Sequence, residues 1–248
     1  IEPPGIPMLN GDEYITMMQE EYHNRDGIVE LDRELRYDVN YSDFYNYSQN
    51  TDWVKAISRD AYTNDHYFEL SGGDRKSLYF TSVNYQDQIG TTLNTSFKRF
   101  SVRANFDYNI SDYLRLTTNL SYTNTYREDN PLTNLWDQEE GQRMSIRGLA
   151  YRKAPHMSIW EYDENGELTG EYFTPIESFQ GLGSIYWNPV AIANLGQADE
   201  KINVIDNNFK LNYIAADWLK IRQTVAFSLE DKQRVEFIPS SAVGSDWV

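Results

Sequence analysis

The strongest constraint on the fold is an alternation of apolar and polar side chains that continues through long stretches of the chain. Between residues 99 and 110, every even-numbered residue is apolar and every odd-numbered residue is polar. Successive side chains of a β-strand point to opposite faces, so this pattern predicts a strand with one apolar and one polar face. The same reasoning predicts six strands, at about 65–71, 76–88, 97–110, 113–126, 203–215 and 217–230.

The predicted strands are long for a soluble sheet, in which strands of 5 to 6 residues are common. A strand of ~13 residues runs about 43 Å at ~3.3 Å per residue. Tilted by ~45°, it rises about 30 Å, which matches the hydrocarbon core of a bilayer. The strand lengths therefore favour a transmembrane β-barrel over a soluble sandwich.

The connections between the predicted strands are sorted by length. Short connections at 72–75, 111–112 and 216 alternate with longer ones at 89–96 and 127–202. In an antiparallel sheet this order places all tight turns at one end and all long loops at the other. Outer-membrane barrels have short periplasmic turns and long extracellular loops, so the order is typical of them.

A soluble fold remains an alternative, in which the apolar strand faces would cover a protein core. That reading makes the chain a secreted β-rich protein that binds or cleaves glycans. The barrel reading predicts instead that the apolar residues of different strands form one continuous outward belt. Its members would include Val102, Phe106, Leu116, Leu120, Ile221 and Phe227.

Composition excludes several kinds of function. There is no cysteine, and the three histidines lie far apart, so neither a thiolate nor a histidine-pair zinc site is present. A net charge of −16 disfavours nucleic acid as a partner. The paired carboxylates read as solvated surface acids, and residues 163–166 read as a turn in which Gly166 supplies a positive φ rather than as a calcium loop. We therefore expect no enzyme activity, no cofactor and no metal site.

Two sets of side chains are candidates for contact with a solute or partner. Exposed aromatic rings in the long loop can stack on sugars or contact another protein, although folding of the loop on itself would use them equally well. These residues are Trp136, Trp160, Tyr162, Tyr172 and Trp187. A basic row on the polar strand faces would line a lumen, or would pair with Asp107 and other carboxylates of the same wall. This row comprises Arg99, Arg103, Arg115, Lys220 and Arg222.

Two helices are expected before the first predicted strand. Asn10, Gly11 and Asp12 form a capping sequence, and Tyr14, Met17 and Met18 follow at helical spacing, with Gly27 as the end of the pattern. A short helix is expected near residues 53–57.

Residues 50–126 resemble the SusC/RagA family of TonB-dependent outer-membrane transporters of the Bacteroidetes. The matching pieces are Asn50-Thr51-Asp52-Trp53, Ser71-Gly72-Gly73, the stretch from Tyr79 to Gly90, the stretch from Arg99 to Asp107 and the strand from Leu114 to Tyr122. Residues 9–14 are similar to the helix that follows the family's first barrel strand. Trp187-Asn188-Pro189-Val190 is similar to the segment that ends a long surface loop.

The resemblance implies an antiparallel transmembrane β-barrel of 22 strands in the whole molecule, filled by a plug and energised by TonB. It also implies a SusD-like surface lipoprotein partner and the import of glycans or peptides through the outer membrane. This chain would supply about six strands of that barrel and carry out no bond chemistry.

The layout expected from this reading has five parts along the chain. Residues 1–64 form an extracellular helix and loop segment, residues 65–126 four barrel strands, and residues 127–202 a long extracellular loop. Residues 203–230 form two further strands, and residues 231–248 begin another extracellular loop.

Overall fold

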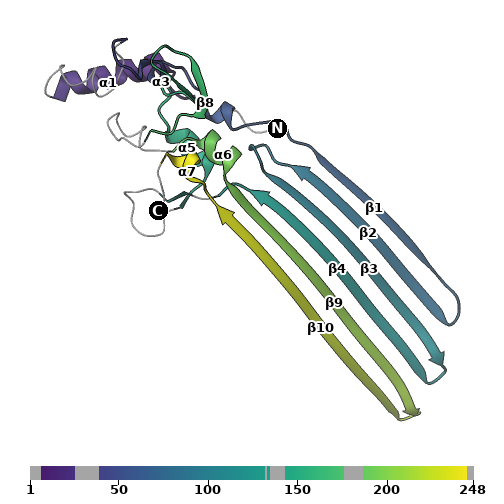
Figure 1. The fold of residues 1–248 in the computed structure, drawn as a ribbon. Coiled ribbons are helices and arrows are strands. Elements are labelled where there is room, and N and C mark those ends of the chain that lie inside the picture. The colour runs from purple at the N-terminus through teal and green to yellow at the C-terminus, as the bar shows by residue number, and fades with distance from the viewer. Residues whose placement is uncertain (1–6, 26–38, 132, 135–142, 176–186, 245–248) are drawn as a thin grey trace.

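The computed structural model describes residues 7–25, 39–131, 133–134, 143–175 and 187–244. Its main element is one antiparallel sheet of six long strands in the order β1-β2-β3-β4-β9-β10 (Figure 1). The strands are β1 (Thr63–Gly73), β2 (Ser77–Ile89), β3 (Ser96–Ser111), β4 (Leu114–Asp129), β9 (Gln197–Ala216) and β10 (Leu219–Phe237). The fold class expected from the alternation is confirmed: the sheet is all-antiparallel, and within the described residues it does not close.

The register of the strands separates two faces cleanly. One cross-strand row joins Phe68, Val83, Val102, Tyr122, Ile205 and Leu229. The row one residue further along each strand joins Glu69, Ser82, Arg103, Ser121, Asp206 and Ser228. Because paired residues share a face, the alternation seen along each strand is in phase across the whole sheet.

The strands are longer than the alternation predicted, most of all at the loop end of the last hairpin. β9 begins at Gln197 rather than near 203, and β10 ends at Phe237 rather than near 230. Residues 197–203 and 230–236 are mostly polar on both faces, so the side-chain pattern fades although backbone pairing continues from Gln197 to Phe237. Hydrophobic periodicity thus reports where a strand is apolar on one side, not where it ends.

The two ends of the sheet differ in the way the connections predicted. Residues 74–76, 112–113 and 217–218 make the tight turns, and all three lie at one end of the sheet (Figure 1). The long connections lie at the other end and fold into a compact unit, which we call the cap. The cap consists of residues 39–62, 90–95, 143–175, 187–196 and 238–244.

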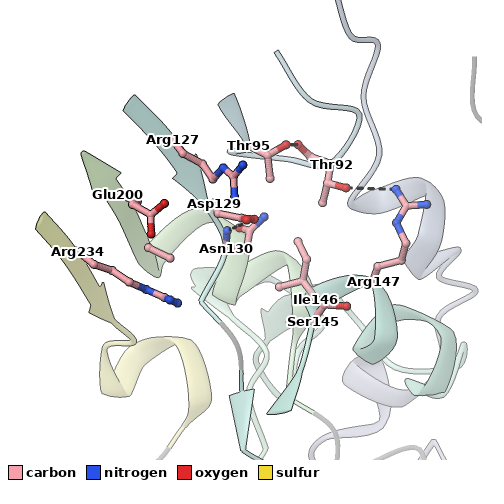
Figure 2. Close-up of a pocket in the computed structure, with 11 residues that line it drawn as sticks. Thr92, Thr95, Arg127, Asp129, Asn130, Ser145, Ile146, Arg147, Glu200 and Arg234 are labelled. Atoms are coloured by element: carbon pink, nitrogen blue, oxygen red, sulfur yellow. Dashed lines mark hydrogen bonds between the residues drawn. The ribbon is translucent and has the colours of Figure 1, made fainter. Parts of the chain in front are cut away.

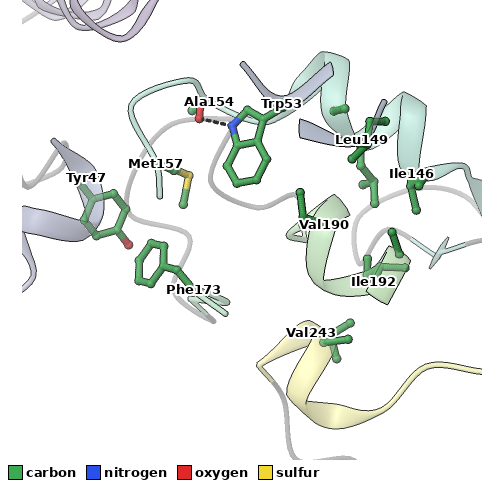
Figure 3. Packing of buried hydrophobic residues seen from close by; sticks show 14 residues of the cluster. Tyr47, Trp53, Ile146, Leu149, Ala154, Met157, Phe173, Val190, Ile192 and Val243 are labelled. Atoms are coloured by element: carbon green, nitrogen blue, oxygen red, sulfur yellow. Dashed lines mark hydrogen bonds between the residues drawn. The ribbon is translucent and has the colours of Figure 1, made fainter. Parts of the chain in front are cut away.

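The cap holds the main hydrophobic core of the described structure (Figure 3). Its helices are α3 (Phe44–Tyr47), α4 (Trp53–Ala56), α5 (Ile146–Arg152), α6 (Pro189–Leu195) and α7 (Ser240–Val243). Ile57, Leu149, Met157 and Ile192 are fully buried among them. The cap also contains a hairpin of β7 (Trp160–Tyr162) and β8 (Leu168–Tyr172), and β5 (Thr133–Asn134) pairs with β6 (Arg143–Met144) beside it.

The motif of residues 50–53 joins distant segments of the cap. The Asn50 Oδ1 atom accepts a hydrogen bond from the Gly11 N–H (3.0 Å), and the Thr51 hydroxyl donates to the Met157 carbonyl (2.6 Å). Asp52 caps α4 through the Lys55 N–H, and the Trp53 indole N–H donates to the Ala154 carbonyl (2.9 Å). Each residue of this motif therefore forms a hydrogen bond with the backbone of another residue, and the one made by Trp53 is buried.

Asn188 does the same for the segment before α6. It is fully buried, and its Oδ1 atom accepts hydrogen bonds from the N–H groups of Val190 (3.0 Å) and Ala191 (3.2 Å). Its Nδ2 atom donates to the carbonyls of Ile159 (2.9 Å) and Phe173 (3.1 Å). The Asn188 side chain therefore caps α6 and also binds the segments that contain Ile159 and Phe173.

The first helix, α1 (Gly11–Arg25), begins where the sequence predicted. Asn10 and Glu13 form a reciprocal capping box, in which each side chain accepts the other residue's N–H at 2.9 Å. The predicted end at Gly27 lies outside the described residues. α4 confirms the short helix expected near residues 53–57, and the cap contains four further short helices, α3, α5, α6 and α7, that the sequence did not predict. Of the helices in the described ranges, none is long and apolar enough to cross a membrane.

Candidate functional site

The polar face of the sheet, which we call the polar wall, carries all five residues of the predicted basic row. The register places Arg99, Arg103, Arg115, Lys220 and Arg222 on this face. In a chain with a net charge of −16, arginines and lysines are about as numerous as carboxylates on this wall. The acidic excess of the molecule therefore lies elsewhere, and the wall is close to neutral.

Two residues of the basic row, Arg115 and Arg222, interact with other side chains of the polar wall. Arg115 forms an ion pair with Asp107, and its Nε donates to Asp107 Oδ1 (2.7 Å). Arg222 donates to Asn212 Oδ1 (3.0 Å), and Asn212 separates it from Arg115 in the same cross-strand row. The pairing with Asp107 that the sequence offered as the structural alternative is thus present for Arg115.

The opposite face forms the predicted apolar belt over five cross-strand rows. Rows two residues apart lie ~6.7 Å from each other along a strand, so the belt extends about 27 Å along the strands. Phe106, Leu120, Ile221 and Phe227 are each between 39% and 50% exposed. Within the described residues, the long strands form a single layer that leads away from the cap, with no second layer over the belt (Figure 1). This arrangement is the one that the barrel interpretation predicts.

A cavity of about 380 Å³ lies where the polar wall meets the cap, and we call it the rim pocket (Figure 2). Arg127, Glu200 and Arg234 reach it from the ends of β4, β9 and β10, where they form one cross-strand row. Arg147 of α5 closes the far side and donates to the Thr92 hydroxyl (3.2 Å). The remaining lining groups are Thr95, Asp129, Asn130, Ser145, Ile146 and Ala198.

The aromatic candidates are divided between surface and core. Trp160 is 42% exposed and stacks on Tyr172, with ring centroids 4.4 Å apart. The Tyr172 hydroxyl accepts a hydrogen bond from Asn194 (2.9 Å), and Trp187 packs against the cap core. Tyr162 is held through its backbone, which exchanges hydrogen bonds with the Asn46 side chain. Trp136 lies outside the described residues.

Two ionisable groups of the cap have shifted pKa values. Lys153, at the C-terminus of α5, is almost fully buried, and this burial lowers the pKa of its ammonium group to about 7. Asp163 lies in the exposed turn of the β7–β8 hairpin, where the N–H groups of Glu167, Asn165 and Gly166 lower the pKa of its carboxyl. Gly166 has φ of +82°, which confirms the turn expected at residues 163–166.

The rim pocket was not predicted from the sequence. Its lining comes from segments up to about 140 residues apart, from Thr92 to Arg234. Strand register joins only part of this lining, namely the row of Arg127, Glu200 and Arg234 and the pair of Asp129 and Ala198. The available signal was the basic residues at the polar-face positions of strand ends. The alternation predicts an earlier end for β4, a later start for β9 and an earlier end for β10 than the structure has, so Arg127, Glu200 and Arg234 all fall just outside the predicted strands.

Comparisons with known proteins agree with this geometry. No protein-family model matches the chain. It is 28% identical over 222 residues to TonB-dependent receptor P3 of Formosa agariphila, covering 88% of this chain and 21% of that protein. It is 22% identical over 180 residues to TonB-dependent receptor SusC of Bacteroides thetaiotaomicron, covering 66% of this chain and 17% of that protein.

Solved structures share the fold. The RagAB peptide transporter matches with a TM-score of 0.62 at 19% identity, covering 95% of this chain and 27% of that one. The RagAB peptide importer in its closed-closed state gives a TM-score of 0.61 at 20% identity and the same coverage. The chain spans about a fifth of the length of the curated relatives it matches. In sequence and in fold, it is therefore a relative of the SusC/RagA family of TonB-dependent receptors and corresponds to a segment of their β-barrel.

Proposed function

We propose that this chain is part of an outer-membrane importer that takes up glycans or peptides with energy supplied through TonB. The observation that carries the proposal is the in-phase division of the six-stranded sheet into an apolar belt and a polar wall. In a barrel the belt faces hydrocarbon and the wall faces a wet lumen. The unpaired edges of β1 and β10 then pair with further strands, since unpaired backbone groups are costly in lipid.

The same proposal orients the molecule and assigns its partners. The tight turns face the periplasm, and the cap lies on the cell surface with the aromatic candidates Trp160, Tyr162, Tyr172 and Trp187. A SusD-like surface lipoprotein is the partner on that side, and TonB acts through a part of the receptor other than the described strands. No residue here carries out bond chemistry: the basic row Arg99, Arg103, Arg115, Lys220 and Arg222 contacts the plug or the passing solute.

Single cysteines in the whole receptor test the topology, because this chain contains no cysteine of its own. A membrane-impermeant maleimide added to intact cells should label Leu168→Cys in the cap. Asp217→Cys in a tight turn should react only after the outer membrane is permeabilised. Labelling of Asp217→Cys in intact cells, with Leu168→Cys protected, would reverse the orientation.

A matched pair on β3 tests the two faces. Ser101→Cys on the polar wall should react with a water-soluble maleimide in the purified receptor, whereas Val102→Cys on the belt should be protected by lipid. Equal labelling of the two neighbours would reject the barrel assignment. Uptake itself is tested by growth on candidate glycans and peptides, which should require both TonB and the receptor.

A further inference from the structure

The rim pocket combines arginines from three directions in a molecule that is otherwise strongly acidic. Arg127 and Arg234 enter it from the strand ends and Arg147 from α5 (Figure 2). The lining also holds the carboxylates of Asp129 and Glu200, so three positive groups face two negative ones and the lining carries a formal charge of +1 in a chain of net charge −16. A positive lining favours an anionic group at short range.

The carboxylates at the pocket already have donors. The Glu200 Oε2 atom forms an ion pair with Lys232 Nζ (2.7 Å), although Arg127 and Arg234 also lie within its electrostatic range. The Asp129 Oδ1 atom accepts the Asn130 N–H (2.8 Å). Each carboxylate of the lining therefore has a donor that is not one of the three pocket arginines.

The arginines themselves differ in how they are held. Arg234 pairs with Glu236 (3.0 Å) but keeps half of its side chain exposed, and Arg147 is oriented by Thr92. In the described structure, the Arg127 guanidinium has no hydrogen bond and no ion pair of its own. A guanidinium group has five N–H donors in a planar fork that matches an oxyanion in two-point contacts. Arg127 is therefore placed to meet such a group, with Arg234 and Arg147 around it.

The rest of the lining indicates what carries the oxyanion. Apart from Ile146 and Ala198, the wall consists of hydroxyl, amide and charged groups, which suit the hydroxyls of a sugar better than apolar peptide side chains. We propose that the rim pocket binds the carboxylate or sulfate group of an acidic oligosaccharide. This inference rests on the proposed function for the origin of the ligand, since a solute entering the lumen passes this rim.

Binding to the purified whole receptor in detergent tests the proposal by calorimetry. The probes are a trigalacturonate, a sulfated tetrasaccharide, the neutral maltotetraose and a short acidic peptide. We expect both acidic sugars to bind and maltotetraose to bind at least ~10-fold more weakly, as the loss of one charge-assisted contact implies. Preference for the carboxylate or the sulfate probe identifies the group that the pocket takes. Neutral sugar bound as tightly as acidic sugar, or the peptide bound in preference to both, would overturn the proposal.

Substitutions locate the binding. Arg127→Gln should weaken the acidic probes ~10-fold and leave the melting temperature of the receptor unchanged, and Arg234→Gln should act in the same direction. Lys201→Gln is the matched control, because it removes one positive charge at the same height on the opposite face. Unchanged affinity for the acidic probes in Arg127→Gln, or an equal loss of affinity in Lys201→Gln, would show that the rim pocket is not the binding site. A receptor that binds acidic sugar through Arg127 but shows no TonB-dependent uptake would contradict the proposed function and not this site.

Discussion

Val102 on β3 pairs directly with Tyr122 on β4, while their chain neighbours Arg103 and Ser121 pair with each other on the opposite face. Val102→Arg should therefore place a charge in the lipid and lower the free energy of unfolding by ~2–4 kcal/mol. Ser101→Arg, one residue earlier on the polar wall, should change it by less than ~0.5 kcal/mol. Denaturant unfolding of the whole receptor in phospholipid vesicles measures both, and similar losses would show that the two faces share one environment.

Asn207 breaks the belt in the row that also contains Leu120 and Phe227. It is only 7% exposed, and its Oδ1 atom has no hydrogen-bond partner in the described structure. Asn207→Leu should stabilise the receptor in vesicles by ~1–2 kcal/mol, because a buried unsatisfied amide oxygen is replaced by apolar atoms. A loss of stability in the same vesicle experiment would mean that the amide has a partner in the whole barrel.

The cap depends on Asn188 more than on any exposed turn residue. Asn188→Ala removes four hydrogen bonds at a fully buried position and should lower the stability of the cap by ~2–4 kcal/mol. A dye on Leu168→Cys reports cap unfolding in guanidinium chloride. Asn165→Ala, in the exposed β7–β8 turn, is the control and should shift the midpoint little.

Burial of Lys153 makes the stability of the cap depend on pH. The folded pKa of about 7 lies below the unfolded value of 10.5, so the unfolded chain binds more protons between these two values. Cap stability should therefore rise as pH increases from 7 towards 10, by at most about 1.4 kcal/mol per pH unit. Comparing wild type with Lys153→Met, measured with the same dye at pH 7, 8 and 9, isolates this slope, which the variant should lack.

Of the aromatic candidates that the structure describes, Trp160 is the most exposed, and its ring stacks on Tyr172. Trp160→Ala should weaken binding of the transported solute or of the lipoprotein partner by ~1–2 kcal/mol with little change in cap stability. Trp187→Ala should instead destabilise the cap, because Trp187 packs against its core. If Trp160→Ala destabilised the cap and Trp187→Ala weakened binding instead, Trp160 would be the core residue and Trp187 the contact residue.

The sheet could be predicted from the sequence because its faces differ in polarity over most of its length. Arg99 to Ile110 alternates without a break, and the structure pairs Arg99 to Tyr108 in register with both neighbours. The cap could not be predicted in the same way. Its helices are four to seven residues long, too short for a helical period to emerge, and contacts such as Trp53 with Ala154 join residues 101 positions apart.

Two of the motifs that resemble the family, residues 50–53 and 187–190, have structural roles in the cap. Asp52 and Asn188 cap helices, and Thr51 and Trp53 reach carbonyls of residues 154–157. Their spacing could be read from the sequence, but their partners could not, because a side-chain hydrogen bond leaves no periodic signal in the partner segment. The rim pocket could not be predicted for a different reason, since its row of Arg127, Glu200 and Arg234 lies just outside the strands that the alternation predicts.

The position of α7 makes completion of the cap core depend on the last of the six long strands. Ala242 and Val243 belong to the cap core, yet they follow β10 in the chain, whereas Tyr47 and Trp53 precede β1. The core therefore gathers residues from before the first of these strands and after the last. The cap core is therefore complete only after all six long strands have been inserted. An assembly intermediate that stops at an earlier hairpin would have an incompletely folded cap that proteases can cleave.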